Sequence, residues 1–323
     1  MKKINIITGF AVLILGIAIV GVVLDHHQQT TERVNGSGIP FLPKIAGSSG
    51  SYVLAATFPV VNDSYPIYQT VTPGAASEEV RRLGDLFGLS GEMKSMPSGN
   101  EVRFVDSSKD SVAELQYYTN SGAYRYEIPE KVYPYSTDRQ PILPSDEEAR
   151  VIATKYLLER DLLPDDVYFS DVSIGAQSGS KTLPTYTLYN LTKNVGFVQD
   201  LQGVRVYNAG ITVTIGESGE VVSAGSSLRE LNPEPVRYVK IVAPEEAYQR
   251  LISGDVVMRL LPDGYDEVVV SDISLGYWME IKTESQKYVL PVYVFSCATP
   301  SGAHRQYVSA VDSSEMQYLT CRN

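Results

Sequence analysis

The residues that most often carry catalysis or bind metal are scarce in this chain of 323 residues. It has three histidines, two cysteines and one tryptophan. His26 and His27 are adjacent in a polar stretch, and His304 stands alone in a predicted turn, Ser301–His304. A hydrolase of the Ser-His type needs a nucleophile, a base and an orienting group, and zinc needs imidazole or thiolate ligands. We therefore assign no catalytic, metal-binding or cofactor-binding residue and expect no cofactor.

Short catalytic motifs and basic charge are lacking as well. The chain has no Gly-x-Ser-x-Gly elbow, no Gly-x4-Gly-Lys-Ser/Thr loop and no His-Glu-x-x-His helix. It carries 27 basic against 38 acidic side chains, a net charge of −11. Nucleic-acid phosphates need a basic surface, so we expect no nucleic-acid partner.

Carboxylates are plentiful, but their positions have structural explanations. Acid pairs begin each of three predicted helices, where the helix dipole favours negative charge: Glu78-Glu79, Glu147-Glu148 and Glu245-Glu246. A second group surrounds predicted turns and could bind calcium through oxygen atoms: Asp165, Asp166, Asp263, Asp266 and Glu267. The EF-hand spacing is missing from that group, so we interpret its members as solvated turn residues.

The two cysteines and three asparagines give candidate modification sites. Cys297 and Cys321 form a candidate disulfide if the compartment is oxidising, and two unrelated thiols are the alternative. Asn35, Asn62 and Asn190 fit the N-glycosylation pattern. The single tryptophan, Trp278, follows Tyr277 in a predicted strand, and we expect it in the core.

The longest uncharged run lies at the start of the chain. Ile4–Leu24 is 21 residues long, enough for a helix to cross the hydrocarbon layer of a membrane. Lys2 and Lys3 precede it and Asp25 follows, which favours a cytoplasmic N-terminus. We predict a single-pass signal-anchor at the cell membrane with the remainder extracytoplasmic. A cleaved signal peptide is the alternative, although its apolar core is usually shorter and ends near small residues.

Part of the sequence occurs twice in the same order. The second occurrence follows the first by about 100 residues, as these pairs show: Glu147-Glu148-Ala149 with Glu245-Glu246-Ala247, Pro164-Asp165-Asp166 with Pro262-Asp263-Gly264, Ser170–Gly175 with Ser271–Gly276, and Leu183–Tyr186 with Leu290–Tyr293. Such internal similarity predicts repeated structural units.

The predicted organisation is an α+β chain of tandem modules. Residues 1–24 form a cytoplasmic tip and the transmembrane anchor, and residues 25–50, rich in glycine and polar side chains, form a flexible tether. Three modules follow at 51–140, 141–232 and 233–323, each with one helix packed on an antiparallel sheet. The clearest helix begins at Ser145, which makes a capping box with Glu148.

One stretch resembles a known superfamily. Phe197–Val206, Ile211–Ile215 and Gly219–Val222 are similar to PepSY and protease-propeptide modules, over roughly residues 145–323. Arg205 stands where those modules commonly have proline, and Ser218 where they often have aspartate. The final part is also similar to ectodomains of membrane-anchored regulators of bacterial sensor kinases. The resemblance implies a non-enzymatic binder, inhibitor or regulator and transfers no functional residue.

Together these features predict a membrane-anchored, extracytoplasmic, non-enzymatic protein of the cell envelope. We expect it to bind or regulate a protein partner in the membrane or envelope, such as a protease or a sensor kinase, while Ile4–Leu24 contacts the membrane itself. Two alternatives stay open: a glycan hydrolase that uses carboxylates alone, and a structural component of the envelope.

Overall fold

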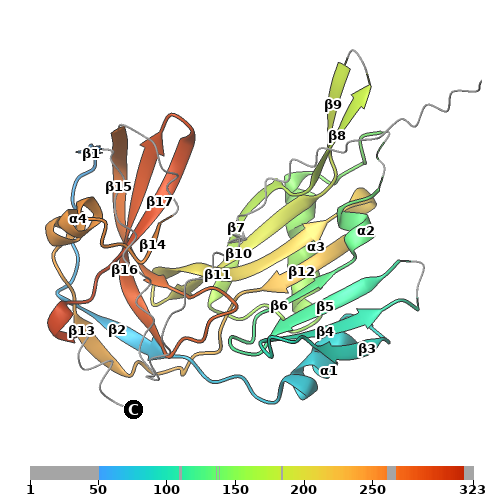
Figure 1. Ribbon diagram of the computed structural model, residues 1–323, viewed down its shortest axis with the longest axis horizontal. Helices are drawn as coiled ribbons and strands as arrows, with labels where there is room; N and C mark the ends of the chain where they lie inside the picture. Colours follow the sequence, from blue (N-terminus) through green and yellow to red (C-terminus); the bar gives the residue numbers. More distant parts are fainter. Residues whose placement is uncertain are drawn as a thin grey trace, which may run out of the picture.

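A computed structural model describes residues 51–108, 111–135, 137, 139–182, 185–259 and 267–315. Within them, fifteen strands form one mixed sheet that runs through two lobes, and two more strands form a separate hairpin (Figure 1). The two lobes are joined where β11 pairs in parallel with β15, at Val206–Tyr277 and Tyr207–Trp278. The protein is therefore mainly β-sheet.

The first lobe contains most of the chain between residues 76 and 226. Its sheet is formed by β3 (Glu92–Ser95), β4 (Glu101–Asp106), β5 (Ala113–Tyr118), β6 (Tyr124–Glu127), β7 (Val167–Ile174), β10 (Lys193–Leu201), β11 (Val204–Ile215) and β12 (Val221–Ser226). Its helices are α1 (Ala76–Leu86), α2 (Pro129–Val132), α3 (Asp146–Leu158) and the short η1 (Glu217–Gly219).

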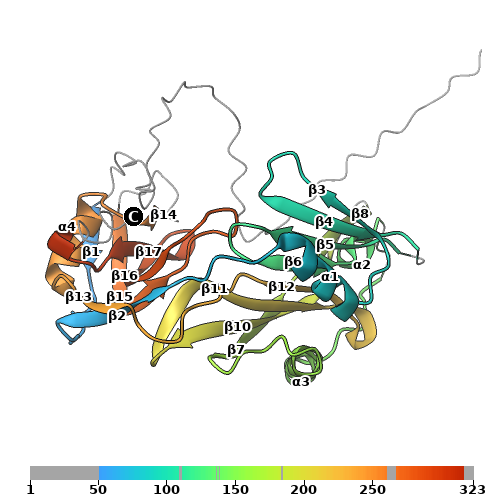
Figure 2. The same ribbon diagram turned by 90° about the horizontal axis from the view of Figure 1, so that it is seen from below.

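The second lobe combines both ends of the described chain. Its elements are β1 (Ser51–Leu54), β2 (Ser64–Gln69), β13 (Arg237–Lys240), α4 (Pro244–Ile252), β14 (Met258–Arg259), β15 (Glu267–Trp278), β16 (Tyr288–Thr299) and β17 (Gly302–Ser309). The chain crosses from this lobe to the first between β2 and α1 (Figure 2). The separate hairpin consists of β8 (Gln177–Thr182) and β9 (Thr185–Asn190).

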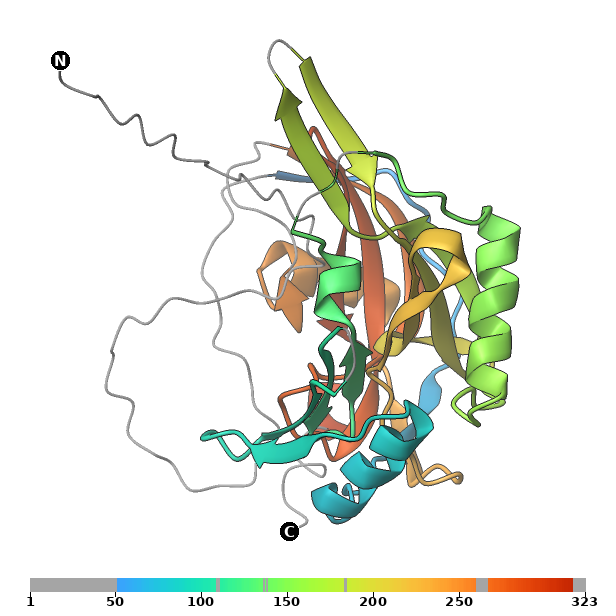
Figure 3. The ribbon, with the colours of Figure 1, turned by 90° about the vertical axis from the view of Figure 1, so that its right-hand side faces the viewer.

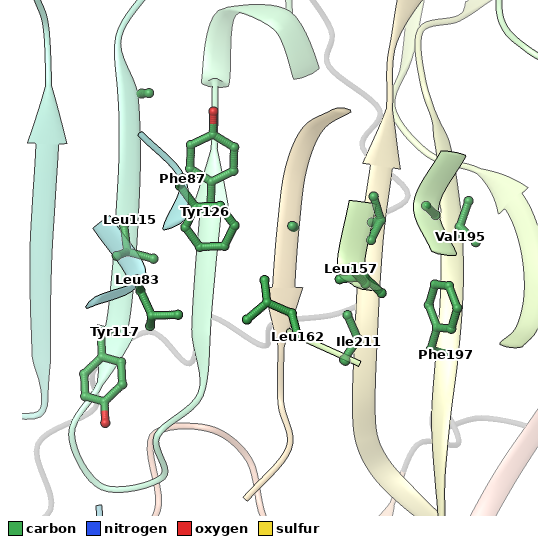
Figure 4. Packing of buried hydrophobic residues seen from close by; sticks show 14 of the residues in the cluster. Leu83, Phe87, Leu115, Tyr117, Tyr126, Leu157, Leu162, Val195, Phe197 and Ile211 are labelled. Carbon is green, nitrogen blue, oxygen red and sulfur yellow. The ribbon is translucent and has the colours of Figure 1, made fainter. Parts of the chain in front are cut away.

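The core of the first lobe lies between its sheet and two helices. In α3, Ala149, Ala153 and Leu157 repeat every four residues and are fully buried, as an amphipathic helix requires. Figure 4 shows Leu83 of α1, Phe87 directly after α1, and Leu157 of α3 lying over the strands that carry Leu115, Ile211 and Phe197. The capping box predicted at Ser145 and Glu148 is confirmed.

The prediction of tandem helix-on-sheet modules is wrong. β1 and β2, expected in the first module, pair with strands of the second lobe: β1 with β15 in parallel, and β2 with β13 and β16. Ile67 of β2 is fully buried there against Val239 and Val311. β6 in turn pairs with β12, which joins the expected first and second modules into a continuous sheet. Strands that are distant in sequence therefore pair with one another, in place of the pairing within each module that we expected.

The internal repeat does not translate into repeated units either. Ser170–Ile174 lies in β7 and Ser271–Leu275 in β15, so this pair of segments shares strand structure. Tyr186, however, lies in the separate β8–β9 hairpin, whereas its counterpart Tyr293 is fully buried in β16 at the centre of the second lobe. The turn at Pro262–Gly264 lies outside the described residues.

The predicted membrane topology also needs correction. Among the described residues, no helix combines the length and the apolar character needed to cross a bilayer. The segment Ile4–Leu24 and the tether 25–50 lie outside those residues. The structure thus gives no support to a single-pass membrane protein with an N-terminal anchor.

Candidate functional site

The first-lobe sheet has one apolar face and one polar face. On β5, Leu115 and Tyr117 point into the core with α1, so Glu114 and Gln116 must point to the other face because side chains alternate along a strand. The same alternation places further polar side chains there, and we call the set the polar face: Glu101, Arg103, Glu114, Gln116, Tyr118, Arg125 and Glu127. It spans β4, β5 and β6.

Hydrogen bonds connect neighbouring strands across the polar face. The Glu101 carboxylate accepts from Arg103 Nε at 2.6 Å and from Gln116 Nε2 at 2.8 Å. Burial opposes the ionised form of Glu101, yet these donors together hold its pKa below the ordinary value. Glu101 is therefore a fixed anion that orients its neighbours.

Glu127 behaves in the opposite way. Glu127 is 9% exposed, and its carboxylate forms an ion pair with Arg125. Its cross-strand neighbour on β5 is Glu114. Burial is the largest cause that raises the pKa of Glu127, Glu114 raises it further, and Arg125 counteracts both. Two carboxylates with unlike environments thus lie side by side on β5 and β6.

The second lobe reaches the edge of the polar face through the turn between β15 and β16. Lys282 Nζ lies 4.6 Å from the centroid of the Tyr118 ring. Ser121 Oγ donates to Lys282 O at 2.6 Å, and Asn120 Nδ2 donates to Thr283 O at 3.0 Å. Burial lowers the pKa of Lys282 and raises that of Tyr118 to about 12.

Arg229 clamps this contact between the lobes. It is 5% exposed, and its guanidinium donates to four backbone carbonyls at 2.8–3.3 Å: Asn120 O, Glu280 O, Ile281 O and Glu284 O. A recess of about 300 Å³ lies on the first-lobe side of the clamp. Its lining includes Pro73, Glu78, Glu79, Tyr117 and Glu230.

The β8–β9 hairpin projects from the first lobe (Figure 3). In the described part of the chain its two strands pair with each other and with no other strand. Its base is fixed, because Thr192 Oγ1 accepts from Ala176 N at 2.7 Å and Leu191 N donates to Ala176 O at 2.8 Å. Leu188, farther out, is 51% exposed. Within the described residues, the outer edges of β8 and β9 therefore have no strand partner, and the Gln140 side chain hydrogen-bonds the β9 backbone only at the base, at Asn190.

The candidate modification sites are scattered. Cys297 is a free, buried thiol in β16, and Cys321 lies outside the described residues, so the disulfide stays a prediction. Asn62 is exposed, Asn35 lies outside the described residues, and Asn190 Oδ1 accepts from Gln177 Nε2 at 2.7 Å. Glycosylation stays a prediction as well.

The acids and the histidine singled out in the sequence are also separated. Glu79 pairs with Arg82, Glu148 caps α3 and Glu246 pairs with Arg250, so each has a local structural role. Asp263 and Asp266 lie outside the described residues, within which no three potential ligands gather as a metal site. His304 belongs to β17 rather than to a turn, and its Nε2 lies 3.1 Å from Ser301 Oγ.

Sequence reasoning did not identify the polar face, although its signal is visible. Polar and apolar residues alternate in Glu101–Phe104 and in Ala113–Tyr117, which predicts two faces. The pairing of Glu127 with Glu114 depends on register, which alternation alone does not fix.

Comparison with known proteins supports a propeptide-like part of the fold. A family model described as Fungalysin/Thermolysin Propeptide Motif matches residues 185–228, from β9 to the segment after β12. The expected resemblance is confirmed at the level of a protease propeptide, and PepSY specifically is not shown. No curated protein matches the chain.

Several solved structures are similar to this chain. One of them is an uncharacterized protein from Eubacterium rectale ATCC 33656, with 11% identity and a TM-score of 0.43, over 81% of this chain and 88% of that chain.

Proposed function

We propose that the chain is a non-enzymatic binding protein that regulates a protease, with the β8–β9 hairpin as part of its binding surface. The observation that carries the proposal is the propeptide match at residues 185–228, which begins at β9 of that hairpin. We also propose that the chain is related to PepSY modules, on the basis of the similarity of Phe197–Val206 to them.

The hairpin suits recognition by strand addition. Asn190 N donates to Gln140 Oε1 at 3.1 Å, away from β8, so this amide points outward from the hairpin. Outward amides recur every second residue in an antiparallel pair, which places the Leu188 N–H on the same edge. An extended segment of a partner can accept hydrogen bonds from such an edge and extend the sheet by one strand.

The edge can be tested with a single amide. Proline at position 188 removes the outward N–H without removing a bond between β8 and β9, whereas valine keeps the N–H. We expect the wild-type chain to inhibit thermolysin cleavage of a fluorogenic peptide in a dose-dependent way. Leu188→Pro should weaken inhibition at least about tenfold, the equivalent of 1.4 kcal/mol, and Leu188→Val should not.

Two results would remove the proposal. One is an unchanged cleavage rate at every concentration together with no co-elution of chain and protease. The other is equal inhibition by the proline and valine variants when both retain the wild-type melting temperature, because the hairpin would then lie outside the binding surface.

A second candidate function, a glycan hydrolase that uses only carboxylates, is favoured by Glu114 and Glu127. They are neighbours on β5 and β6, and burial raises the pKa of Glu127 as a general acid requires. If this function holds, Glu114→Gln and Glu127→Gln each abolish turnover of a soluble glycan panel while the protein stays folded. The absence of turnover by the wild-type chain on that panel would remove this candidate.

A further inference from the structure

The junction of β11 with the second lobe gathers aromatic rings and positive charge on one face of the sheet. Trp278 of β15 packs on Tyr307 of β17 with ring centroids 4.7 Å apart. Tyr207 of β11 meets Tyr307 edge-on at 5.5 Å. Gly276 leaves room for this arrangement, because a Cβ there would collide with the Tyr207 ring.

Two arginines share the ring of Tyr207. The guanidinium carbon of Arg205 lies 5.2 Å from the ring centroid, and that of Arg305 lies 5.9 Å from it. Both distances are within the range of cation–π attraction, so one ring brings together two like charges from β11 and β17. Burial raises the pKa of Tyr307, and the nearby Arg305 opposes that rise.

The net charge of the protein is −11, and an acidic residue, Asp200, is the cross-strand partner of Arg205. The Asp200 carboxylate, however, accepts a hydrogen bond from Gly203 N in the adjoining turn. Among the described residues, neither Arg205 nor Arg305 forms an ion pair with a carboxylate. Within the same part of the chain, Arg205 Nε and Trp278 Nε1 are buried and have no hydrogen-bond partner. All of these nitrogens are donors, because guanidinium and indole groups carry no acceptor.

We infer that Arg205, Tyr207 and Arg305 form a binding site for a carboxylate-bearing peptide segment. A carboxylate supplies the acceptors and the negative charge that the two guanidinium groups lack, and arginine binds it in a bidentate way. Arg305 is exposed and Arg205 is half-buried, so a ligand can reach both from solvent. The aromatic rings offer the remainder of a peptide an apolar contact.

That the ligand is a peptide rests on the proposed function, whereas the site itself rests on the geometry of the cluster. It lies at the β11–β15 junction, at the opposite end of β11 from the segment that pairs with Lys193 near the hairpin base. An acidic segment of a bound protein would thus occupy a second contact region in addition to, and apart from, the one proposed on β9.

The single tryptophan makes the test direct, because all tryptophan emission comes from Trp278. The full chain is titrated with acetylated hexaglutamate amide, with hexaglutamine amide as the uncharged control and sodium phosphate as the free-anion control at equal ionic strength. We expect a saturable change in emission with hexaglutamate alone, weakened by added sodium chloride because exposed charges are screened.

Variants assign the binding to the two arginines. Arg305→Gln and Arg205→Gln should each weaken hexaglutamate binding about tenfold, the equivalent of one lost charge-assisted contact. Arg81→Gln, which removes an exposed arginine of α1, should leave the affinity unchanged. Because Arg305 is exposed, its variant provides the test even if Arg205→Gln does not fold.

Three outcomes overturn the inference: no saturable change with hexaglutamate, equal weakening by Arg81→Gln, or a phosphate response that matches the hexaglutamate response. The last outcome would mean a general anion site and not a peptide site. Thermolysin inhibition that persists without hexaglutamate binding would remove this site alone. Hexaglutamate binding without inhibition would leave the site in place and remove the proposed function.

Discussion

At the scale of single residues, Cys297 shows how burial controls reactivity. Its side chain is buried in β16 and donates weakly to Phe295 O at 3.6 Å. Burial raises the pKa of its thiol to about 11, so almost none of the reactive thiolate is present at neutral pH.

We expect Cys297 to resist iodoacetamide at pH 8 in the folded protein and to react once guanidinium unfolds it. Peptide mass mapping distinguishes it from Cys321. If the two cysteines form the predicted disulfide, neither reacts in guanidinium until a reductant is added. Rapid alkylation of Cys297 in the native protein would contradict the buried thiol.

Glu127 gives a pH dependence of stability. Its pKa is raised in the folded state, so the folded form binds the proton more tightly than the unfolded chain does. The stabilisation from this proton is complete below the ordinary value of 4.5 and is lost as the pH rises through the raised pKa. The free energy of unfolding of the wild type should therefore decline over this pH range, and we expect Glu127→Gln to lack this contribution to the decline.

Urea unfolding of wild type and Glu127→Gln between pH 4 and pH 7 measures this difference. The free energy of unfolding of the wild type should fall relative to the variant as the pH rises. A difference between the two proteins that stays constant with pH would show that Glu127 has an ordinary pKa in the folded state.

At the scale of elements, the β10–β11 hairpin depends on one glycine. Gly210 has a φ of +156°, and a Cβ there would collide with the backbone oxygen of Phe197 on the paired strand. Backbone atoms cannot move aside as a flexible side chain can. We therefore expect Gly210→Ala to lower the free energy of unfolding by about 3 kcal/mol.

Gly203, in the turn of the same hairpin, is the matched control. Its φ is +82° and no atom lies within 4 Å of the position of a Cβ, so alanine there adds only backbone strain. In the same urea experiment, Gly203→Ala should lower the free energy of unfolding by only about 1 kcal/mol. Equal losses at the two positions would mean that crowding against Phe197 contributes nothing.

The elements themselves could be predicted from the sequence better than their pairing. The capping box at Ser145 and the apolar spacing of Ala149, Ala153 and Leu157 are local signals, and α3 forms as expected. The partners of β1 and β2 lie more than 150 residues away, and no local pattern specifies them. The composition of the polar face could not be predicted for the same reason. Glu114 and Glu127 become neighbours only through the register in which β5 and β6 pair.

At the scale of the whole molecule, the two lobes are joined by the short β11–β15 pairing and by Arg229. Arg229→Gln removes a buried guanidinium that donates to four carbonyls of two turns. Buried carbonyls without a hydrogen-bond partner destabilise the folded state. We therefore expect Arg229→Gln to lower the free energy of unfolding by about 3–5 kcal/mol.

The same variant should separate the unfolding of the two lobes. In urea, the wild type is expected to unfold in one transition, and Arg229→Gln in two, because the contact between the β15–β16 turn and Asn120 is lost. Arg229→Lys keeps the charge but not the planar fork, and should recover part of the stability. A single, unshifted transition for Arg229→Gln would show that the lobes are held together elsewhere.

The pairing of β1 and β2 with β13, β15 and β16 also constrains how the protein is made. During synthesis the ribosome releases β2 long before its partners, so the strand must wait while most of the first lobe emerges and folds. During that interval its exposed edge can pair with a neighbouring nascent chain. We therefore expect the second lobe to be the part that a chaperone protects until translation ends.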